Sequence, residues 1–107
     1  METDAPTFEI YLNVEIWNQD KTHCGFANKR TKLPFQPHCG MIIKTKLGEF
    51  CFPHVVWDMT TRVFEASSRV VAGWDEQQRF LDVQYYIDEF RRDSWNIIQP
   101  RERKWRD

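Results

Sequence analysis

Apolar and polar side chains alternate strictly along the first regular segment of the chain. From residue 8 onward, every second position is apolar: Phe8, Ile10, Leu12, Val14 and Ile16. A period of two places successive side chains on opposite faces of an extended backbone. The alternation therefore predicts a half-buried strand over residues 8–17.

The next twenty or so residues show no such period. Residues 18–37 open with Asn, Gln, Asp and Lys, and Pro34 and Pro37 lie near their end. We expect a loop here. An unstructured loop of about twenty residues in a compact domain is usually functional or contains a short element of its own.

Short extended segments are expected in the middle of the chain. Residues 40–46 and 49–57 predict two strands joined by a hairpin at Leu47–Gly48. Pro53 cannot donate a ladder hydrogen bond, so it is expected to interrupt the second strand or to place it at a sheet edge. Two further extended pieces are expected at 61–66 and 69–71.

A helical period follows. Four apolar residues recur at spacings of three and four, namely Phe80, Val83, Ile87 and Phe90. Such residues lie on one face of an α-helix. Asp75 and Gln78 have the spacing of a capping box, so the helix is expected to start near Asp75 and to run for about five turns. A last strand is expected at 95–99, ended by Pro100.

Together these elements predict an α+β fold. A chain of 107 residues suits a single domain with one modest core. We expect an antiparallel β-sheet of about five strands with one long helix, in the C-terminal half, packed on one face. Residues 1–7 and 101–107 are expected to form flexible tails.

Charge is segregated along the chain, although the net charge is only −1. Residues 21–46 contain six basic and no acidic side chains, residues 75–89 contain five acids and one Arg, and the segment from Arg101 is basic again. This segregation favours oriented association with another protein. An isoelectric point near 6.3 argues against a dedicated nucleic-acid-binding protein.

The composition also suggests a location. No apolar run has the length needed to span a bilayer, and the chain opens on acidic and polar residues, unlike a signal peptide. A cytoplasmic protein without a membrane partner is therefore expected. In that compartment the three cysteines are expected to be free thiols or metal ligands. The oligomeric state is left open.

All thiols and imidazoles of the chain lie in one window, from His23 to His54. Zinc takes four Cys or His ligands, and Cys51 and His54 have the spacing of a zinc knuckle. The best tetrad is Cys24, Cys39, Cys51 and His54. The separation of Cys24 from Cys39 fits no standard finger, so no cofactor is favoured, and a zinc-stabilised binding module is retained as an alternative.

The same window contains the residues of a thiol hydrolase or acyl transferase. An imidazole within hydrogen-bond reach of a cysteine generates a thiolate nucleophile. His38 would be the base, Cys24 or Cys51 the nucleophile, and Glu65 or Asp58 the group that orients the imidazole. This enzyme is the second alternative.

Residues 31–71 contain a more specific pattern. Residues 31–43 read Thr-Lys-Leu-Pro-Phe-Gln-Pro-His-Cys-Gly-Met-Ile-Ile, and residues 63–71 read Val-Phe-Glu-Ala-Ser-Ser-Arg-Val-Val. The segment resembles the histidine-bearing half of the circularly permuted NlpC/P60 papain-like hydrolases. The resemblance implies that His38 matches the catalytic histidine. The family's cysteine follows the histidine half, and no cysteine follows Cys51 here, which implies a reduced, non-catalytic relative.

The interpretation that we favour is a small non-enzymatic binding protein of the inhibitor, immunity-protein or phage-type modulator class. Its partner is expected to be another protein. The basic segment 21–46, the acidic helix and the tail near Trp105 are the expected contact surfaces. The expected binding residues are Arg30, Lys32, Phe35, Tyr85 and Trp105.

Overall fold

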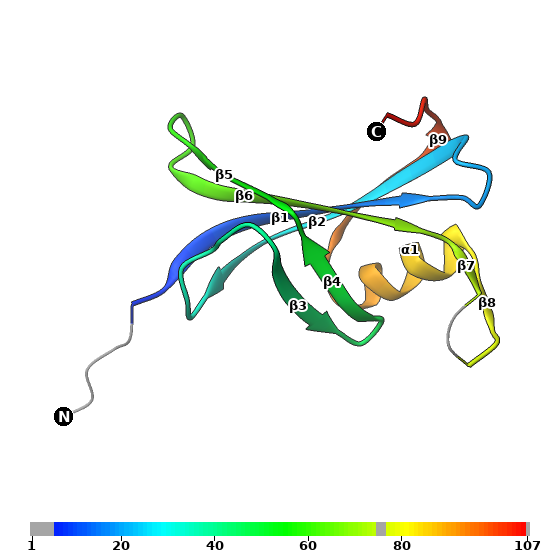
Figure 1. Ribbon diagram of the computed structural model, residues 1–107, viewed down its shortest axis with the longest axis horizontal. Helices are drawn as coiled ribbons and strands as arrows, with labels where there is room; N and C mark the ends of the chain where they lie inside the picture. The colour runs from blue at the N-terminus through cyan, green and yellow to red at the C-terminus, as the bar shows by residue number, and fades with distance from the viewer. Residues whose placement is uncertain (1–5, 75–76, 107) are drawn as a thin grey trace. The chain divides into compact units, whose positions relative to one another are not determined.

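The computed structural model describes residues 6–74 and 77–106 (Figure 1). About 57% of the described residues lie in strands and about 10% in a helix. The elements are β1 (Phe8–Trp17), β2 (His23–Leu33), β3 (Met41–Thr45), β4 (Gly48–Phe52), β5 (His54–Asp58), β6 (Val63–Val71), β7 (Gly73–Trp74), β8 (Phe80–Leu81), α1 (Val83–Arg92) and β9 (Asn96–Glu102). The expected α+β fold with one long helix is therefore wrong, since the chain is mostly sheet with one short helix.

The helix is short because its N-terminus lies later than the sequence predicts. Asp82 is the N-cap, and its side chain accepts a hydrogen bond from the Tyr85 N–H at 2.8 Å. Gln78 has a left-handed backbone (φ 62°), and Phe80 and Leu81 form β8, so neither segment is helical. Asp75 lies outside the described residues. Among residues 6–74 and 77–106, no helix is long and apolar enough to cross a membrane.

The main sheet has five strands in the order β5-β6-β1-β2-β9. The β5–β6 and β2–β9 pairs are antiparallel. β1 and β6 instead run in the same direction, as their arrows show in Figure 1 and as the bond from the Ala72 N–H to the Trp17 carbonyl indicates at the ends of both strands. The sheet is therefore mixed, and the expectation of a purely antiparallel sheet is wrong.

The predicted loop at 18–37 contains the longest described strand, β2. Its pattern of buried side chains does not alternate, because the register with β9 shifts between Cys24 and Phe26. Such a bulge adds one residue and breaks the period of two. Gly25 and Asn28 are also weak strand formers. Both features hide the strand from an analysis of alternation.

The expected hairpin is confirmed as β3 and β4, which pair from Met41–Phe52 to Thr45–Gly48. Pro53 separates β4 from β5, and these two strands belong to different sheets. The two short pieces expected at 61–66 and 69–71 form one strand, β6. Ser68, a buried polar residue of β6, interrupts the apolar pattern of this strand. Its hydroxyl donates a hydrogen bond to the Cys51 carbonyl at 2.6 Å, so the buried hydroxyl has a partner.

The last strand continues past the proline that was expected to end it. Pro100 lies inside β9, which is an edge strand of the five-stranded sheet. An edge position tolerates a residue without an N–H donor. Arg101 and Glu102, expected in a flexible tail, pair with Cys24 and His23 instead.

The chain forms two compact units. Unit 1 comprises the N-terminal segment up to Leu12 together with residues 30–68, and unit 2 comprises residues 13–29 together with the chain from Arg69 onward. Strands β1, β2 and β6 contribute residues to both units. The buried apolar side chains of unit 1 are Ile10, Leu12, Leu33, Met41, Phe50, Phe52, Val63 and Ala66. Those of unit 2 are Val14, Ile16, Trp17, Cys24, Ala27, Ala72, Leu81, Ile87, Phe90 and Trp95.

In unit 2, Gly25 lies where α1 and β9 approach β2. A Cβ atom built on Gly25 would lie 3.1 Å from the Ile87 Cδ1, the Ile98 carbonyl oxygen and the Pro100 Cγ. Two of these neighbours belong to an element of the sheet and one to the helix. A side chain at this position would therefore fit only if these neighbours moved by a few tenths of an ångström.

We expect Gly25→Ala to lower the free energy of unfolding by about 1–3 kcal/mol, because overpacking at a close contact displaces the surrounding atoms. Gly73→Ala is the matched control, since a Cβ there has no atom within 4 Å. Urea unfolding followed by circular dichroism measures both. Equal stability of the two variants would contradict this account of the packing.

Candidate anion-binding surface

The structure divides the thiols and imidazoles between the two units. Cys24 is buried in unit 2, whereas Cys39, Cys51, His38 and His54 are exposed in unit 1. Within the part of the chain that the structure describes, no three His, Cys, Asp or Glu side chains are grouped closely enough to hold a metal ion. Cys24 therefore belongs to a different unit from the other three members of the predicted tetrad, and the zinc alternative stays a prediction.

Cys24 has the properties of a core residue. Burial, and after it the nearby carboxylate of Glu15, raises the pKa of its thiol to about 11. The thiol lies 3.2 Å from the Gly25 carbonyl oxygen, to which it donates. At neutral pH the sulfur is protonated and shielded from solvent, which makes it a poor nucleophile.

The other candidate catalytic groups contact the main chain. The Cys39 thiol lies 3.7 Å from the Val55 carbonyl oxygen, and the Cys51 thiol lies 4.0 Å from that of Gly40. His38 Nδ1 lies 3.3 Å from the carbonyl oxygen of Cys39. Glu65 lies on β6, opposite Val56 of β5. None of these contacts joins a thiol to an imidazole, so the geometry adds no support to the hydrolase alternative.

The burial of the three thiols predicts their reactivity. At pH 8 we expect iodoacetamide to modify Cys39 and Cys51 in the folded protein, while Cys24 reacts only after denaturation, because its thiol is buried and its pKa is raised. Peptide mass spectrometry of a time course identifies the modified residues. Rapid labelling of Cys24 in the folded protein at pH 8 would contradict the assignment of this residue to the core.

The expected binding residues lie in different environments. Arg30 forms an ion pair with Glu9 at 2.9 Å, and this hydrogen bond holds the pKa of the Glu9 carboxyl below its ordinary value. Arg30 therefore already has an anionic partner. Lys32, Phe35 and Tyr85 are exposed, with Phe35 beside the His38 ring at 6.3 Å between centroids. Arg30, Lys32 and Phe35 belong to unit 1, whereas Tyr85 belongs to unit 2.

Trp105 is at the centre of a denser arrangement. Its ring meets the Trp17 ring edge-on, with 5.0 Å between centroids and an interplanar angle of 73°. The Lys21 ammonium lies 4.6 Å from the Trp105 centroid, and the Arg69 guanidinium carbon lies 4.5 Å from it. Both distances are those of cation–π interactions. One tryptophan thus contacts two cations that are far apart in the sequence.

The carboxylate of Glu15 contacts two members of this arrangement. Glu15 Oε1 accepts a hydrogen bond from the Trp17 indole N–H at 3.0 Å and lies 3.3 Å from Arg69 Nε. A main-chain bond from the Arg103 N–H to the Thr22 carbonyl, at 2.9 Å, joins the segment after β9 to the β1–β2 loop. These contacts position Trp105 although it lies outside every strand.

Arg103 adds a third cation held against an aromatic ring. Its guanidinium carbon lies 4.7 Å from the Phe26 centroid. Its Nε–H is buried and has no hydrogen-bond acceptor among the residues described. A buried charged donor without an acceptor carries a desolvation cost that an added anion would remove.

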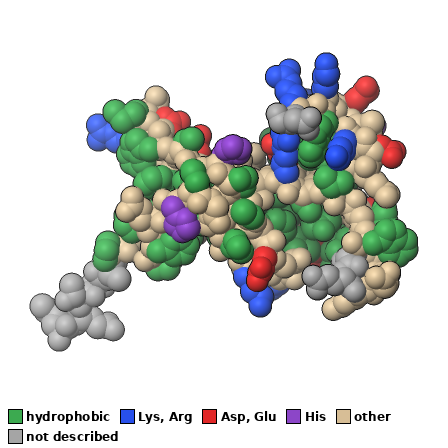
Figure 2. Space-filling model, viewed as in Figure 1, with side chains coloured by type: hydrophobic (Ala, Val, Ile, Leu, Met, Phe, Trp, Pro, Cys, Tyr) green, Lys and Arg blue, Asp and Glu red, His purple; other side chains and the backbone are tan. Residues whose placement is uncertain are grey.

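Two shallow grooves adjoin Trp105, with volumes of about 490 and 610 Å³. Five basic and two acidic residues line them. The basic residues are Lys21, Arg69, Arg103, Lys104 and Arg106, and the acidic ones are Glu15 and Glu102. Figure 2 shows Lys and Arg side chains gathered where β9 ends. We call these five cations with Trp105 the Trp105 surface, and its excess of positive charge suits an anionic ligand.

Sequence analysis found only part of this surface. It identified Trp105 and the basic residues that flank it. It missed Lys21 as a partner of Trp105, and it missed Arg69 and Glu15. The signal that could have identified Glu15 is its place on the polar face of β1, immediately before two buried residues. The pairing of β1 with β6, which sets Arg69 beside Glu15, has no sequence signal.

Comparison with known proteins assigns no family to the chain. No family model, curated protein or solved structure matches it. The resemblance of residues 31–71 to the NlpC/P60 hydrolases therefore stays a prediction. Functional inference has to come from the geometry.

Proposed function

We propose that this chain is a non-enzymatic binding protein that captures an acidic segment of another protein on the Trp105 surface. The observation that carries the proposal is the group of five cations at the Trp105 surface, three of which lie against aromatic rings, with two carboxylates among the described residues that line the same grooves. One of these carboxylates, Glu15, is already engaged by Arg69 and Trp17. The remaining charge is available to a ligand.

The aromatic contacts hold some of these cations in positions that suit the binding of carboxylates. A guanidinium that lies over a ring keeps its planar edge of N–H donors free, and this edge binds a carboxylate through two parallel hydrogen bonds. Arg69 and Arg103 lie over rings in this way, at 4.5 Å from Trp105 and 4.7 Å from Phe26. Arg69 Nε already contacts Glu15 and Arg103 Nε is buried, so a ligand would use their terminal N–H groups. Because their positions are fixed before binding, less side-chain entropy is lost on association.

The same contacts disfavour single-stranded nucleic acid as the ligand. Proteins that bind single strands offer open aromatic faces on which bases stack. Here Lys21 and Arg69 lie over Trp105, Arg103 lies over Phe26, and Trp17 is only 3% exposed. Carboxylate side chains reach the cations without needing a free ring face, so an acidic protein segment fits better.

A charge-reversal experiment tests this function. We expect Lys104→Glu/Arg106→Glu to weaken binding of a fluorescein-labelled decaglutamate peptide by about tenfold or more, since each substitution replaces an attraction by a repulsion. Lys44→Glu/Lys46→Glu is the matched control, because both lysines are exposed, lie in unit 1 and give the same change in net charge. Fluorescence anisotropy at roughly 50 mM salt measures the affinity, and added salt is expected to weaken it.

The outcomes separate the alternatives. Equal loss of affinity in both charge-reversed variants would show that net charge, not the Trp105 surface, controls binding. Tighter binding of a labelled oligothymidylate than of the peptide at equal salt would show that the ligand is a nucleic acid. Either result would contradict the proposal.

A further inference from the structure

In unit 1, β5 has few of the features that usually keep a sheet edge from pairing, since its one acidic residue, Asp58, lies at the end of the strand. β5 is the terminal strand of the five-stranded sheet, its register with β6 shows no shift, and its five residues include no Lys and no Pro. Native edge strands usually carry a charge, a proline or a bulge that blocks another strand. The opposite edge, β9, carries Pro100, Arg101 and Glu102.

The main chain of this edge is directed outward at two residues. The Asp58 carbonyl accepts a hydrogen bond from the Arg62 N–H at 2.8 Å across the hairpin turn, so the main chain of Asp58 faces β6. Hydrogen-bonding direction alternates along an antiparallel strand. The N–H and C=O groups of Val55 and Trp57 therefore face away from β6, where the Cys39 thiol makes a long contact of 3.7 Å with the Val55 carbonyl.

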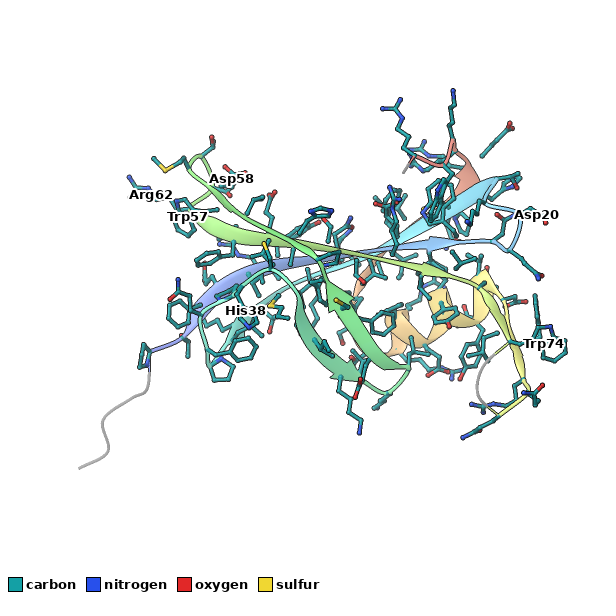
Figure 3. All side chains as sticks on the ribbon, viewed as in Figure 1. Asp20, His38, Trp57, Asp58, Arg62 and Trp74 are labelled. Carbon is teal, nitrogen blue, oxygen red and sulfur yellow. The ribbon has the colours of Figure 1, made fainter. Side chains whose placement is uncertain are left out.

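The side chains along this edge are apolar and exposed. Val56 is 56% exposed, Trp57 48% and Met59 79%. Figure 3 shows Trp57, Asp58 and Arg62 together at the end of the β5–β6 hairpin. Trp57 packs edge-on against Phe64, at 5.0 Å between ring centroids, so its ring is held in position on the sheet. An exposed apolar strand with outward-facing main-chain groups is a template for another strand. Pairing would replace the long contact of the Cys39 thiol with the Val55 carbonyl.

The sequence of β5 is complementary to itself. We propose that two copies of this chain pair through antiparallel β5 strands, about a two-fold axis at Val56. In this register His54 lies opposite Asp58 of the second copy, Val55 lies opposite Trp57, and Val56 lies opposite Val56. The pairing therefore has a valine–valine contact at its centre, an apolar pair on each side of it, and a histidine–carboxylate pair at each end.

The hydrogen-bonding pattern agrees with this register. Val55 and Trp57, whose main-chain groups face outward, become the hydrogen-bonded pairs. His54, Val56 and Asp58 become non-hydrogen-bonded pairs, in which opposite side chains approach most closely. The Asp58 carboxylate can accept a hydrogen bond from His54 of the second copy, and main-chain N–H groups of Thr60 and Thr61 already hold the pKa of this carboxyl below its ordinary value. A slip by one residue would lose both histidine–carboxylate pairs.

Sedimentation velocity tests the pairing in the full chain. The measurement covers roughly 10 to 200 µM, since so short an interface falls below the roughly 1,200 Å² of stable complexes. We expect wild type and Ile42→Lys to form dimers and Val56→Lys to weaken dimerisation by about tenfold or more, because two like charges would meet at the axis. Ile42 is the matched control, as it is 59% exposed on another strand of unit 1.

Cross-linking tests the register without a loss of stability. In a Cys39→Ser/Cys51→Ser background, Val56→Cys is expected to form a disulfide between copies under oxidised glutathione, at least about tenfold faster than Ile42→Cys. A monomeric wild type over the whole range would overturn the proposal, as would a dimer that Val56→Lys leaves intact. Equal cross-linking of the two cysteine variants would overturn it as well.

Discussion

The contact of cations with the Trp105 ring is the interaction on which the candidate function depends. Lys21 and Arg69 come from the β1–β2 loop and from β6, and Trp105 lies beyond β9, so three distant segments meet at one ring. Each cation–π contact contributes about 0.5–2 kcal/mol, depending on how far it is shielded from water. The ring, together with the Glu15 carboxylate beside Arg69, offsets the repulsion between these like charges.

The charges at this surface contribute little to the stability of the fold. The Arg69–Glu15 pair is partly solvent-exposed, so its contribution to folding is small. The buried Nε–H of Arg103 has no acceptor among the described residues and costs stability. Its retention beside four further cations is typical of a surface that is completed by a ligand.

The sequence predicted the fold where patterns are local and failed where pairing between distant segments decides. β1 and the β3–β4 hairpin follow from alternation and turn residues. The strand β2 was missed because its bulge at Gly25 breaks the alternation and its residues have low strand propensity. The helix was placed too early, since Phe80 fits the apolar period of the helix yet pairs with Trp74 in a short ladder.

The candidate site was likewise predicted only where its residues are close together in the sequence. Trp105 was identified from its basic neighbours in the sequence. Its partners Lys21 and Arg69 were not, because nothing local indicates that β1 and β6 lie side by side in parallel. For the thiols and imidazoles, closeness in the sequence was misleading. The residues between His23 and His54 suggested one site, but the structure divides them between two units.

A two-dimensional NMR titration tests the central claim most directly. The ¹⁵N-labelled chain is titrated with unlabelled hexaglutamate, and the indole N–H of Trp105 and the side-chain N–H groups of Arg69 and Arg103 are followed. The account predicts that these signals shift together and saturate, and that added salt reverses the shifts. Saturating shifts confined to unit 1, with the Trp105 indole unchanged, would contradict it.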